Sequence, residues 1–304
     1  MILEIQNISK SYGKTKALIN FSATLTPGIY ALLGPNGSGK STLMNIITDN
    51  LKADNGIITY TDGEGDGEDV LKMGVRFREK LGFMPQYPGM YPQFRASEFL
   101  RYMCVLKDVG AELKGRAKKS FVDEHVNSLL EAVELSDVAN HKISSFSGGM
   151  KQRLALASAL IGDPDILILD EPTAGLDPKQ RVSIRNYIAR IAFNKIVIIA
   201  THVVSDVEYI AKEVIILKKG IIVDRAHPSE IIKKIEGKVW HITATAAEVE
   251  AYQKTYRVNN IAHDSEGNAT IRVLSEEKPT DRSEAVSPNL EDYYLSVFGN
   301  TATE

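Results

Sequence analysis

Apolar and polar residues follow two different periods along this chain, and the changes between them mark its elements. Residues 3–6 alternate apolar and polar side chains, a pattern typical of a strand with one buried face. Residues 28–33 are a short apolar run, whereas Leu43, Ile46 and Ile47 recur at the spacing of a helix. The polar, glycine-rich segment between them is therefore predicted to join a buried strand to a helix.

The middle of the chain predicts a helical region set into an α/β core. Residues 96–138 are rich in helix formers and contain no strand-like run. Residues 165–169 and 196–200 are short apolar runs typical of buried parallel strands, and helical sequence follows each of them. We expect a parallel-sheet domain with a helical subdomain inserted at about residues 87–146.

A shift in composition after residue 235 predicts a second, smaller domain. Its expected elements are a strand at 240–244, a helix at 246–256, two strands around a hairpin turn at Ser265-Glu266-Gly267-Asn268, and a last helix at about 290–297. No residues in this part have catalytic spacing. The predicted fold class is α/β, with a large domain at residues 1–232 and a small α+β domain at 237–304.

Composition and charge narrow the classes of protein that fit. The 304 residues are 43% hydrophobic and 25% charged, as in an ordinary globular protein, and the net charge of −3 offers no footprint for nucleic acid. No apolar run approaches the roughly 20 residues that span a bilayer, and the N-terminus lacks the basic start of a signal peptide. The single cysteine, Cys104, suits a reducing compartment. We expect a cytosolic chain whose membrane role would depend on a partner.

The glycine-rich segment carries the strongest candidate chemistry. Its residues are Gly34-Pro35-Asn36-Gly37-Ser38-Gly39-Lys40-Ser41-Thr42. They match the pattern G-x-x-x-x-G-K-[ST] at every fixed position. Glycines in such a loop let backbone N–H groups surround phosphate oxygens, and the positive end of the following helix faces the same anion. We expect Lys40 to reach the β- and γ-phosphates of a nucleoside triphosphate and the Ser41 hydroxyl to ligate Mg²⁺.

A second candidate site lies directly after the apolar run at 165–169, where Asp170 and Glu171 follow. A buried parallel strand delivers its last residues to the sheet edge where ligands of open α/β sheets bind. Asp170 is therefore predicted to hold Mg²⁺, directly or through water, and Glu171 to accept a proton from an attacking water. An acidic pair after a strand is common and would not by itself indicate a catalytic site. The glycine-rich loop in the same chain is the reason to predict one here.

A third motif, Ser147-Gly148-Gly149-Met150-Lys151-Gln152-Arg153, stands shortly before that strand. With these three motifs in this order, the chain resembles the ATP-binding cassette (ABC) ATPases over residues 1 to about 230. The resemblance implies a P-loop NTPase fold, with a RecA-like parallel sheet, an antiparallel β subdomain and a helical insertion. It also implies that the chain binds ATP and Mg²⁺ and hydrolyses ATP.

The same resemblance implies roles for four further residues. Tyr12 stands where the family stacks an aromatic ring on adenine, with an ordinary core or surface aromatic as the alternative. Gln86 matches the glutamine that senses Mg²⁺ and the attacking water, and that touches the membrane partner. Asp177 matches the loop that crosses the dimer interface, and His202 matches the histidine that contacts the γ-phosphate.

The third motif also has a physical meaning of its own. Ser147, Gly148 and Gly149 precede a predicted helix that carries Met150 and Leu154 on one apolar stripe. A serine hydroxyl and bare backbone amides at a helix N-terminus form a second anion site. In the family this site closes over the ATP that the other protomer holds. The resemblance therefore implies a head-to-tail dimer with a second copy or a homologous cassette.

Two departures from the commonest family pattern bear on the branch. Phe146 replaces the usual leucine and Met150 the usual glutamine. Met150 with its neighbours, and the extension ending at residues 289–294, resemble the ABC-2 type branch of bacterial exporters of drugs, bacitracin-like or lantibiotic peptides, polysaccharides and sodium. This resemblance implies a separately encoded transmembrane permease, with the chain bound peripherally on the inner face of the cell membrane.

Other interpretations stay open at this point. One is a soluble ABC-type ATPase of translation or DNA repair, and another is a nucleotide-dependent regulatory module without hydrolysis, which the presence of Glu171 disfavours. The aromatic-rich residues 87–92 are either a docking surface for a membrane protein or ordinary loop packing. Residues 62–69 are spaced like the start of a calcium loop, but a solvated hairpin tip is favoured because position 73 is Met73 rather than glutamate.

Overall fold

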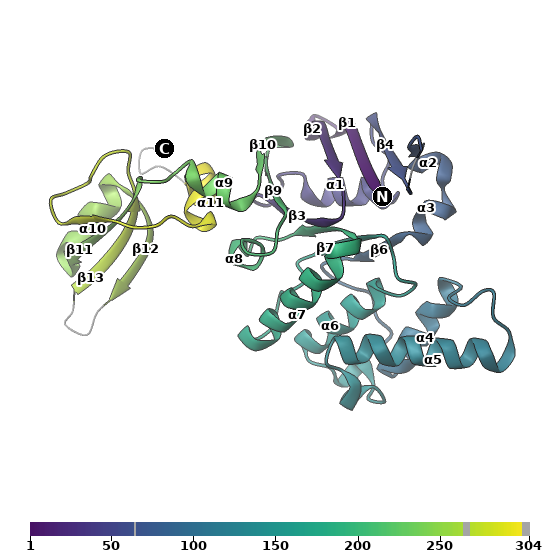
Figure 1. Ribbon diagram of the computed structural model, residues 1–304. Coiled ribbons are helices and arrows are strands. Elements are labelled where there is room, and N and C mark those ends of the chain that lie inside the picture. Colours follow the sequence, from purple (N-terminus) through teal and green to yellow (C-terminus); the bar gives the residue numbers. More distant parts are fainter. Residues whose placement is uncertain (64, 264–267, 300–304) are drawn as a thin grey trace. The chain divides into compact units, whose positions relative to one another are not determined.

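The computed structural model describes residues 1–63, 65–263 and 268–299 (Figure 1). The chain forms two compact units, residues 1–202 with 210–223, and residues 203–209 with 224 onward. Among the described residues, the first unit contains two sheets and the second unit one. The predicted domain boundary between residues 232 and 237 stays a prediction.

A six-stranded sheet, ordered β10-β9-β3-β8-β7-β6, forms the centre of the first unit. Its strands are β3 (Gly28–Leu33), β6 (Leu81–Met84), β7 (Ile166–Asp170), β8 (Ile196–Ala200), β9 (Glu213–Lys218) and β10 (Ile221–Ala226). β3 pairs in parallel with β8 and β9, and β7 pairs in parallel with β6 and β8. The carboxyl ends of these strands therefore share one edge, and the two predicted parallel strands are confirmed.

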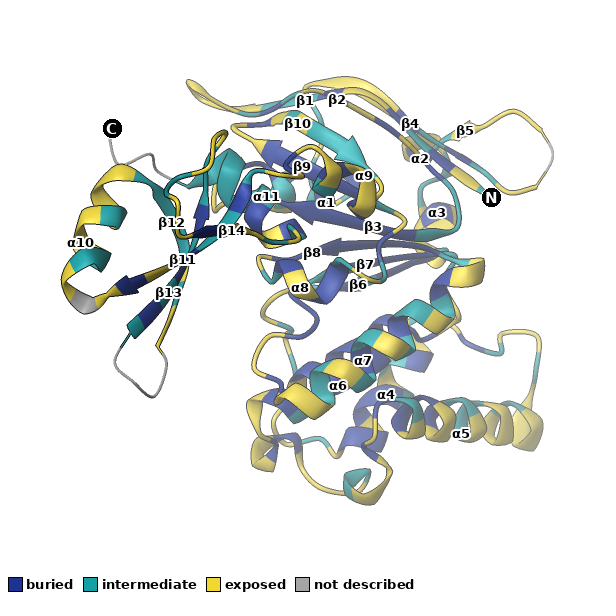
Figure 2. Cartoon of the chain, turned by 60° about the vertical axis from the view of Figure 1, so that its left-hand side comes forward, coloured by how far each residue is buried: buried dark blue, intermediate teal, exposed yellow. Residues whose placement is uncertain are grey.

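Helices cover both faces of this sheet because its central strands are apolar on both sides. They are α1 (Lys40–Ile47) on one face, and α6 (Gly148–Ala159) and α7 (Pro178–Ile191) with the short η3 (Ala192–Asn194) on the other (Figure 2). Every residue of β8 is buried. α1 buries Leu43, Ile46 and Ile47, as their spacing predicted.

An antiparallel sheet, ordered β2-β1-β4-β5, shares a core with α1 and the central sheet. Its strands are β1 (Ile2–Tyr12), β2 (Thr15–Leu25), β4 (Asn55–Thr61) and β5 (Glu68–Asp69), and α2 (Val70–Met73) and α3 (Val75–Glu79) follow. This sheet is the antiparallel subdomain that the resemblance implied. The described residues between β4 and β5 are mostly exposed, as a solvated hairpin tip requires.

The predicted helical insertion is confirmed between β6 and β7. It contains α4 (Ala96–Leu106), α5 (Gly115–Ala132), η1 (Ser136–Val138) and η2 (Ile143–Ser145) ahead of α6. α5 is 18 residues long but buries only Val126, Leu129 and Leu130, so its other faces stay polar. No helix among the described residues is both long enough and apolar enough to cross a membrane.

The second unit is built on a four-stranded sheet, ordered β12-β13-β11-β14. Its elements are α8 (Val204–Val207), α9 (Pro228–Lys233), β11 (Val239–Thr245), α10 (Ala246–Thr255), β12 (Arg257–His263), β13 (Asn268–Leu274), β14 (Ser283–Ala285) and α11 (Leu290–Phe298). The strands and helices predicted here are confirmed, whereas the three-residue β14 was not predicted. The predicted turn lies outside the described residues except for Asn268.

Candidate functional site

The glycine-rich loop connects β3 to α1 at the carboxyl edge of the parallel strands. Gly34, Gly37 and Gly39 have φ values of 157°, 79° and 111°. A Cβ atom at Gly34 would lie 2.4 Å from the Leu217 carbonyl oxygen, and one at Gly39 would lie 2.5 Å from the Ala17 carbonyl oxygen. Backbone conformation and close packing together therefore require glycine at Gly34 and Gly39.

One polar group of this loop has no hydrogen-bond partner in the described part of the chain, and the helix that follows the loop begins without a side-chain cap. α1 begins after Gly39, which has no side chain to cap the N–H groups of the first turn. The Ser38 hydroxyl is buried and has no hydrogen-bond partner among the described residues. Buried polar groups in proteins are normally paired, so an unpaired hydroxyl beside uncapped N–H groups indicates a site that an anion completes.

Lys40, the first residue of α1, reaches back over the loop. Its Nζ donates to the carbonyl oxygens of Gly34 and Pro35 at 2.6 and 3.1 Å. Burial lowers the pKa of Lys40, and the negative charges of Glu171 and Asp170 act in the opposite direction. The ammonium group thus interacts electrostatically with both carboxylates of the predicted acidic pair.

Asp170, the last residue of β7, lies on the same edge of the sheet and is half-buried. Burial and the neighbouring Glu171 carboxylate raise the pKa of Asp170 to about 6, while Lys40 opposes them. Two adjacent carboxylates beside one ammonium group leave an excess of negative charge in a partly buried place. This part of the site therefore favours a cation.

Glu171 is held in place by its burial, its backbone conformation and several hydrogen bonds, none of which the sequence predicted. It is 7% exposed and has a φ of 52°, in the left-handed region that few residues other than glycine adopt. Its N–H donates to the Ala200 carbonyl oxygen at 2.8 Å. The Thr201 hydroxyl donates to Oε2 at 2.9 Å, and the His202 backbone N–H donates to Oε1 at 3.0 Å. The residues that follow β8 thus hold the carboxylate of Glu171.

His202 completes this group of residues. Its side chain is 71% exposed, and its Nδ1 lies 2.6 Å from Glu171 Oε1. Because β7 and β8 are parallel neighbours with Asp170 beside Ala200, the residues after both strands meet at one edge. The structure therefore brings together Lys40, Glu171 and His202, which lie far apart in the sequence.

Tyr12 and Gln86 lie at two other exposed positions of the first unit. Tyr12 ends β1 and its side chain is 52% exposed, so a core role for this ring is excluded. Gln86 is exposed and follows β6, whose last residue, Met84, pairs with Leu169 of β7. Gln86 thus leaves the sheet at the edge where Asp170 lies.

The residues of the third motif open helix α6. Ser147 is exposed, and its hydroxyl accepts the N–H of Met150 at 3.2 Å as the N-cap. A Cβ atom at Gly149 would lie 3.3 Å from the Gly175 carbonyl oxygen, so this turn packs against the segment that carries Asp177. Asp177 in turn caps α7 by accepting a hydrogen bond from the backbone of the third helical residue. Among the described residues, no hydrogen bond joins this second group to the glycine-rich loop.

Two residues that touch the site were not predicted from the sequence. Thr201 holds the Glu171 carboxylate, and Gln152 Nε2 donates to the Glu171 carbonyl oxygen at 2.6 Å. The sequence predicted that α6 buries one apolar stripe. The structure buries more of this helix than that, because residues 152–157 are all buried. Gln152 and Arg153 stand inside this buried helix, and only their hydrogen bonds, which no sequence pattern displays, explain their burial.

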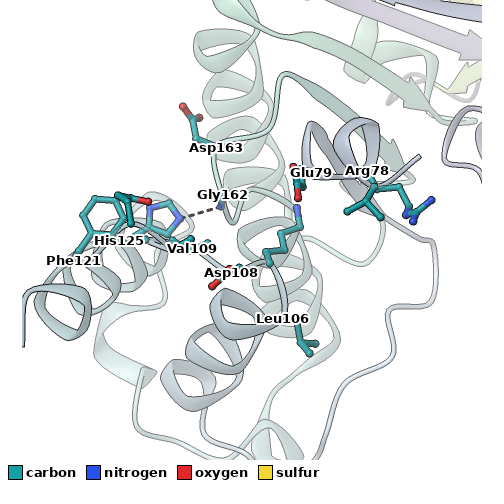
Figure 3. Close-up of a pocket in the computed structure, with 14 residues that line it drawn as sticks. Arg78, Glu79, Leu106, Asp108, Val109, Phe121, His125, Gly162 and Asp163 are labelled. Carbon is teal, nitrogen blue, oxygen red and sulfur yellow. Dashed lines mark hydrogen bonds between the residues drawn. The ribbon is translucent and has the colours of Figure 1, made fainter. Parts of the chain in front are cut away.

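A separate hollow of about 740 Å³ lies on the helical insertion, between α3, the end of α4, residues 108–112 and α5 (Figure 3). Phe121 and His125 project from α5 at its wall, and His125 Nε2 accepts the N–H of Gly162 at 3.4 Å. Burial lowers the pKa of His125. None of the predicted site residues lines this hollow, so it is distinct from the phosphate-binding edge.

The uncapped glycine-rich loop and the buried acidic strand end together define a P-loop ATPase. The family model described as ABC transporter matches residues 18–174, just over half of the chain. The chain therefore belongs to the ABC transporter family.

Two relatives match nearly the whole chain. The linearmycin resistance ATP-binding protein LnrL of Bacillus subtilis (strain 168) is 30% identical over 321 residues, which covers 99% of this chain and 99% of that protein. The Nod factor export ATP-binding protein I of Bradyrhizobium diazoefficiens (strain JCM 10833 / BCRC 13528 / IAM 13628 / NBRC 14792 / USDA 110) is 29% identical and covers 98% of this chain and 97% of that protein.

A solved structure, the dimeric bacterial ABC transporter cassette MJ0796, matches with a TM-score of 0.64 and 28% identity over 74% of this chain and 98% of that one. The same cassette has also been solved in a post-hydrolysis state bound to ADP and Pi. The fold is that of an ABC cassette with an additional C-terminal β-sheet domain. The protein is the ATP-binding, ATP-hydrolysing subunit of an ABC transporter.

Proposed function

We propose that two copies of this chain, or one copy and a homologous cassette, close head to tail around two MgATP and drive a separately encoded permease. The observation that carries this proposal is the separation of two anion-binding groups within one chain. The glycine-rich loop has unpaired phosphate-binding groups, and Ser147 stands exposed at another helix N-terminus without a hydrogen bond to that loop. Each group is half of a nucleotide site.

ATP binding uses the loop and α1. The N–H groups around Gly37 and Gly39 surround the phosphates, with the Ser38 hydroxyl and Thr42 at the base of the cradle. Lys40 exchanges its two loop carbonyl acceptors for β- and γ-phosphate oxygens, which carry more negative charge. The exposed ring of Tyr12 stacks on adenine.

Mg²⁺ fits the donor set of this edge. Asp170, Ser41 and Gln86 supply only oxygen ligands, and burial together with the Glu171 carboxylate raises the pKa of Asp170 to about 6, while Lys40 opposes them. No group of three or more histidine, cysteine, aspartate or glutamate side chains that could hold a metal ion exists among the described residues, and phosphate oxygens of bound ATP would supply further ligands. When bound, Mg²⁺ would neutralise charge on the phosphate oxygens.

Glu171 acts as the general base. Its buried carboxylate accepts hydrogen bonds from Thr201 and from the His202 backbone, which fixes its direction at the sheet edge. A water placed in line with the γ-phosphate gives its proton to this carboxylate as its oxygen bonds to the γ-phosphorus, and the bond from that phosphorus to the departing ADP oxygen breaks. His202 and Gln86 lie at the same edge of the sheet. Together with Lys40 they stabilise the negative charge that develops on the phosphate oxygens.

The lid of each site comes from the partner copy. Ser147 and Gly149 of one copy cover the γ-phosphate held by the other, and Asp177, whose segment packs against Gly149 of its own copy, lies at the boundary between the two copies. The dimeric state in which MJ0796 was solved supports this arrangement. ATP then binds the closed dimer more tightly than the open one, and hydrolysis releases it.

Export through an ABC-2 type permease is the transport that the comparisons favour. LnrL and the Nod factor export protein match this chain over both of its units. Next to Gln86, Tyr87 and Tyr91 are 84% and 45% exposed, which suits docking to a permease at the inner face of the membrane. A soluble translation or repair ATPase is disfavoured because both of these full-length relatives are transport or resistance proteins by name.

The test is to trap the dimer. Glu171→Gln removes the base and leaves its shape, so ATP is bound but not consumed, and the purified variant should become dimeric when ATP is added. Glu236→Gln, an exposed change of the same type, is the control and should behave as the parent. Sedimentation with ATP and with ADP measures the dimer. A Glu171→Gln variant that stays monomeric while saturated with ATP would overturn the head-to-tail proposal.

A further inference from the structure

Gln152 is buried on α6 and reaches the one residue of the site whose backbone is strained. Its side chain is 7% exposed, and its Nε2 donates to the Glu171 carbonyl oxygen at 2.6 Å. Gln152 belongs to the third motif, and Leu154, Ala155 and Leu156 beside it on the helix are apolar and buried. A buried amide costs free energy unless it is hydrogen-bonded, and the bond to Glu171 meets this need for Nε2.

The backbone of Glu171 needs such an attachment. A residue with a side chain rarely adopts a φ of 52°, and it stays there only when its surroundings hold it. Several groups do so: the Ala200 carbonyl oxygen at the end of β8 accepts the Glu171 N–H at 2.8 Å, Thr201 and the His202 N–H bind the carboxylate at 2.9 and 3.0 Å, and Gln152 from α6 binds the carbonyl. The Ala174 N–H, in the turn after β7, also donates to the Glu171 carbonyl oxygen, at 3.1 Å, and Gln152 adds to this oxygen a side-chain bond from α6.

We propose that Gln152 is a positioning residue that holds Glu171 in its left-handed conformation and thereby aims the carboxylate at the attacking water. The proposal rests on the function assigned above to Glu171 and deepens it. Gln152 stands about one and a half turns after Ser147 on the same helix. A shift of α6 when Ser147 closes over the partner's nucleotide therefore reaches the base of its own copy, so that the lid of one site adjusts the base of the other.

The experiment compares Gln152→Leu, which keeps the volume and removes the donor, with Gln152→Glu, which keeps the shape and replaces the donor by an acceptor. We expect kcat to fall by about 10- to 100-fold in both, as a displaced catalytic group typically causes. The KM for ATP and the nucleotide-induced rise in melting temperature should stay within about twofold of the parent, because Gln152 does not touch the phosphate cradle. Ser158→Ala, farther along α6, is the matched control and should leave all three unchanged.

Two further readouts separate positioning from a merely structural role. Both Gln152 variants should accumulate the ATP-bound dimer, as a site that closes but hydrolyses slowly must. In a Glu171→Gln background, Gln152→Leu should lower the residual turnover by less than about twofold, because the group it positions is already gone.

Each of the following results would decide whether Gln152 positions Glu171. Parental kcat in both Gln152 variants overturns the inference, and so does a parallel loss of ATP binding and dimer formation in both. An additional loss of turnover comparable to the single variant, in the Glu171→Gln background, overturns it as well. If Glu171→Gln itself hydrolyses at the parental rate, the assignment of the base fails first, and that result is distinguishable because it needs no Gln152 variant.

Discussion

The two units of this protein each bury a carboxylate, and they differ in how far neighbouring groups of the chain balance its charge. In the second unit Asp292, 2% exposed, accepts hydrogen bonds from Arg272 Nε and Nη2 at 2.9 and 2.6 Å, from Asn259 Nδ2 at 2.9 Å and from the Asn289 N–H at 2.9 Å. Burial alone would raise the pKa of Asp292, but these partners lower it. Its charge is balanced within the chain.

In the first unit the acidic pair, Asp170 and Glu171, has no comparable arginine among the described residues: its neighbours are the ammonium group of Lys40 and the His202 ring, whose Nδ1 lies 2.6 Å from Glu171 Oε1. Glu171 is held by a hydroxyl and a backbone N–H, and the pKa of Asp170 is raised to about 6 by burial and by Glu171. The nearby ammonium group of Lys40 is bonded to the glycine-rich loop instead. The difference separates a carboxylate that stabilises a fold from a pair that is left for ligands to complete.

The largest expected effect is the loss of turnover in Glu171→Gln. Removing the base should lower kcat by about 10²- to 10⁴-fold, the contribution typical of general base catalysis. The free energy of unfolding should not fall, because the change removes the repulsion between two neighbouring carboxylates. Steady-state phosphate release and urea denaturation measure the two quantities. If Glu171→Gln is inactive only because it is less stable, Glu171 has a structural role like that of Asp292 and the proposed difference between the two carboxylates is wrong.

Asp292→Ala should show the reverse. Leaving the Arg272 guanidinium without its buried partner should lower the free energy of unfolding of the second unit by about 3–5 kcal/mol. The ATPase kcat of the folded protein should stay within about twofold, because Asp292 belongs to the unit without the phosphate site. Asp281→Ala, at an exposed position of the same unit, is the control. Equal stability of both variants in chemical denaturation would contradict the structural role of Asp292.

Acidification should weaken cation binding at Asp170. A carboxyl group whose folded pKa is raised stabilises the fold below its unfolded pKa, near 4, and loses that contribution as pH rises through about 6. A bound cation requires the ionised form, so Mn²⁺ affinity in the presence of ATP should fall by up to about tenfold per pH unit below 6. Asp170→Asn should remove this pH dependence. A wild-type affinity that is constant from pH 7 to pH 5 would show that Asp170 does not bind the cation.

Two helix caps give the smallest and most selective test. Ser147 caps α6 and Asn289 caps α11, and replacing either by alanine should cost about 1 kcal/mol of stability. Only Ser147→Ala should also lower turnover, because only that cap is part of a nucleotide site. Thermal melts and ATPase assays of the two variants make the comparison. Equal turnover in the two variants would show that Ser147 only caps α6 and is not part of a nucleotide site.

The sequence predicted most of the framework because its signals are local. The apolar runs that became β3, β7 and β8, the helical spacing of α1 and the Ser147 cap each depend on residues close together in the chain. The three-residue β14 was missed because it pairs with β11 through its backbone and has no apolar pattern of its own.

The contacts that set the chemistry could not be predicted in the same way. Gln152 and Thr201 contact Glu171 across 19 and 30 residues, and although Gln152 stands in the third motif, the sequence does not indicate that either side chain contacts Glu171. The φ of Glu171 is equally invisible, because the chain uses glutamate where a turn alone would favour glycine. Tertiary contacts over such separations are decided by packing rather than by local pattern.

The measurement that tests the head-to-tail account most directly is turnover per subunit as a function of protein concentration, with the dimer fraction of each sample determined by sedimentation. If each nucleotide lies between a cradle on one copy and a lid on the other, turnover rises in step with the dimer fraction and disappears when Ser147 is replaced by arginine. Turnover that is independent of concentration in a strictly monomeric sample, and that survives the Ser147→Arg change, would contradict it.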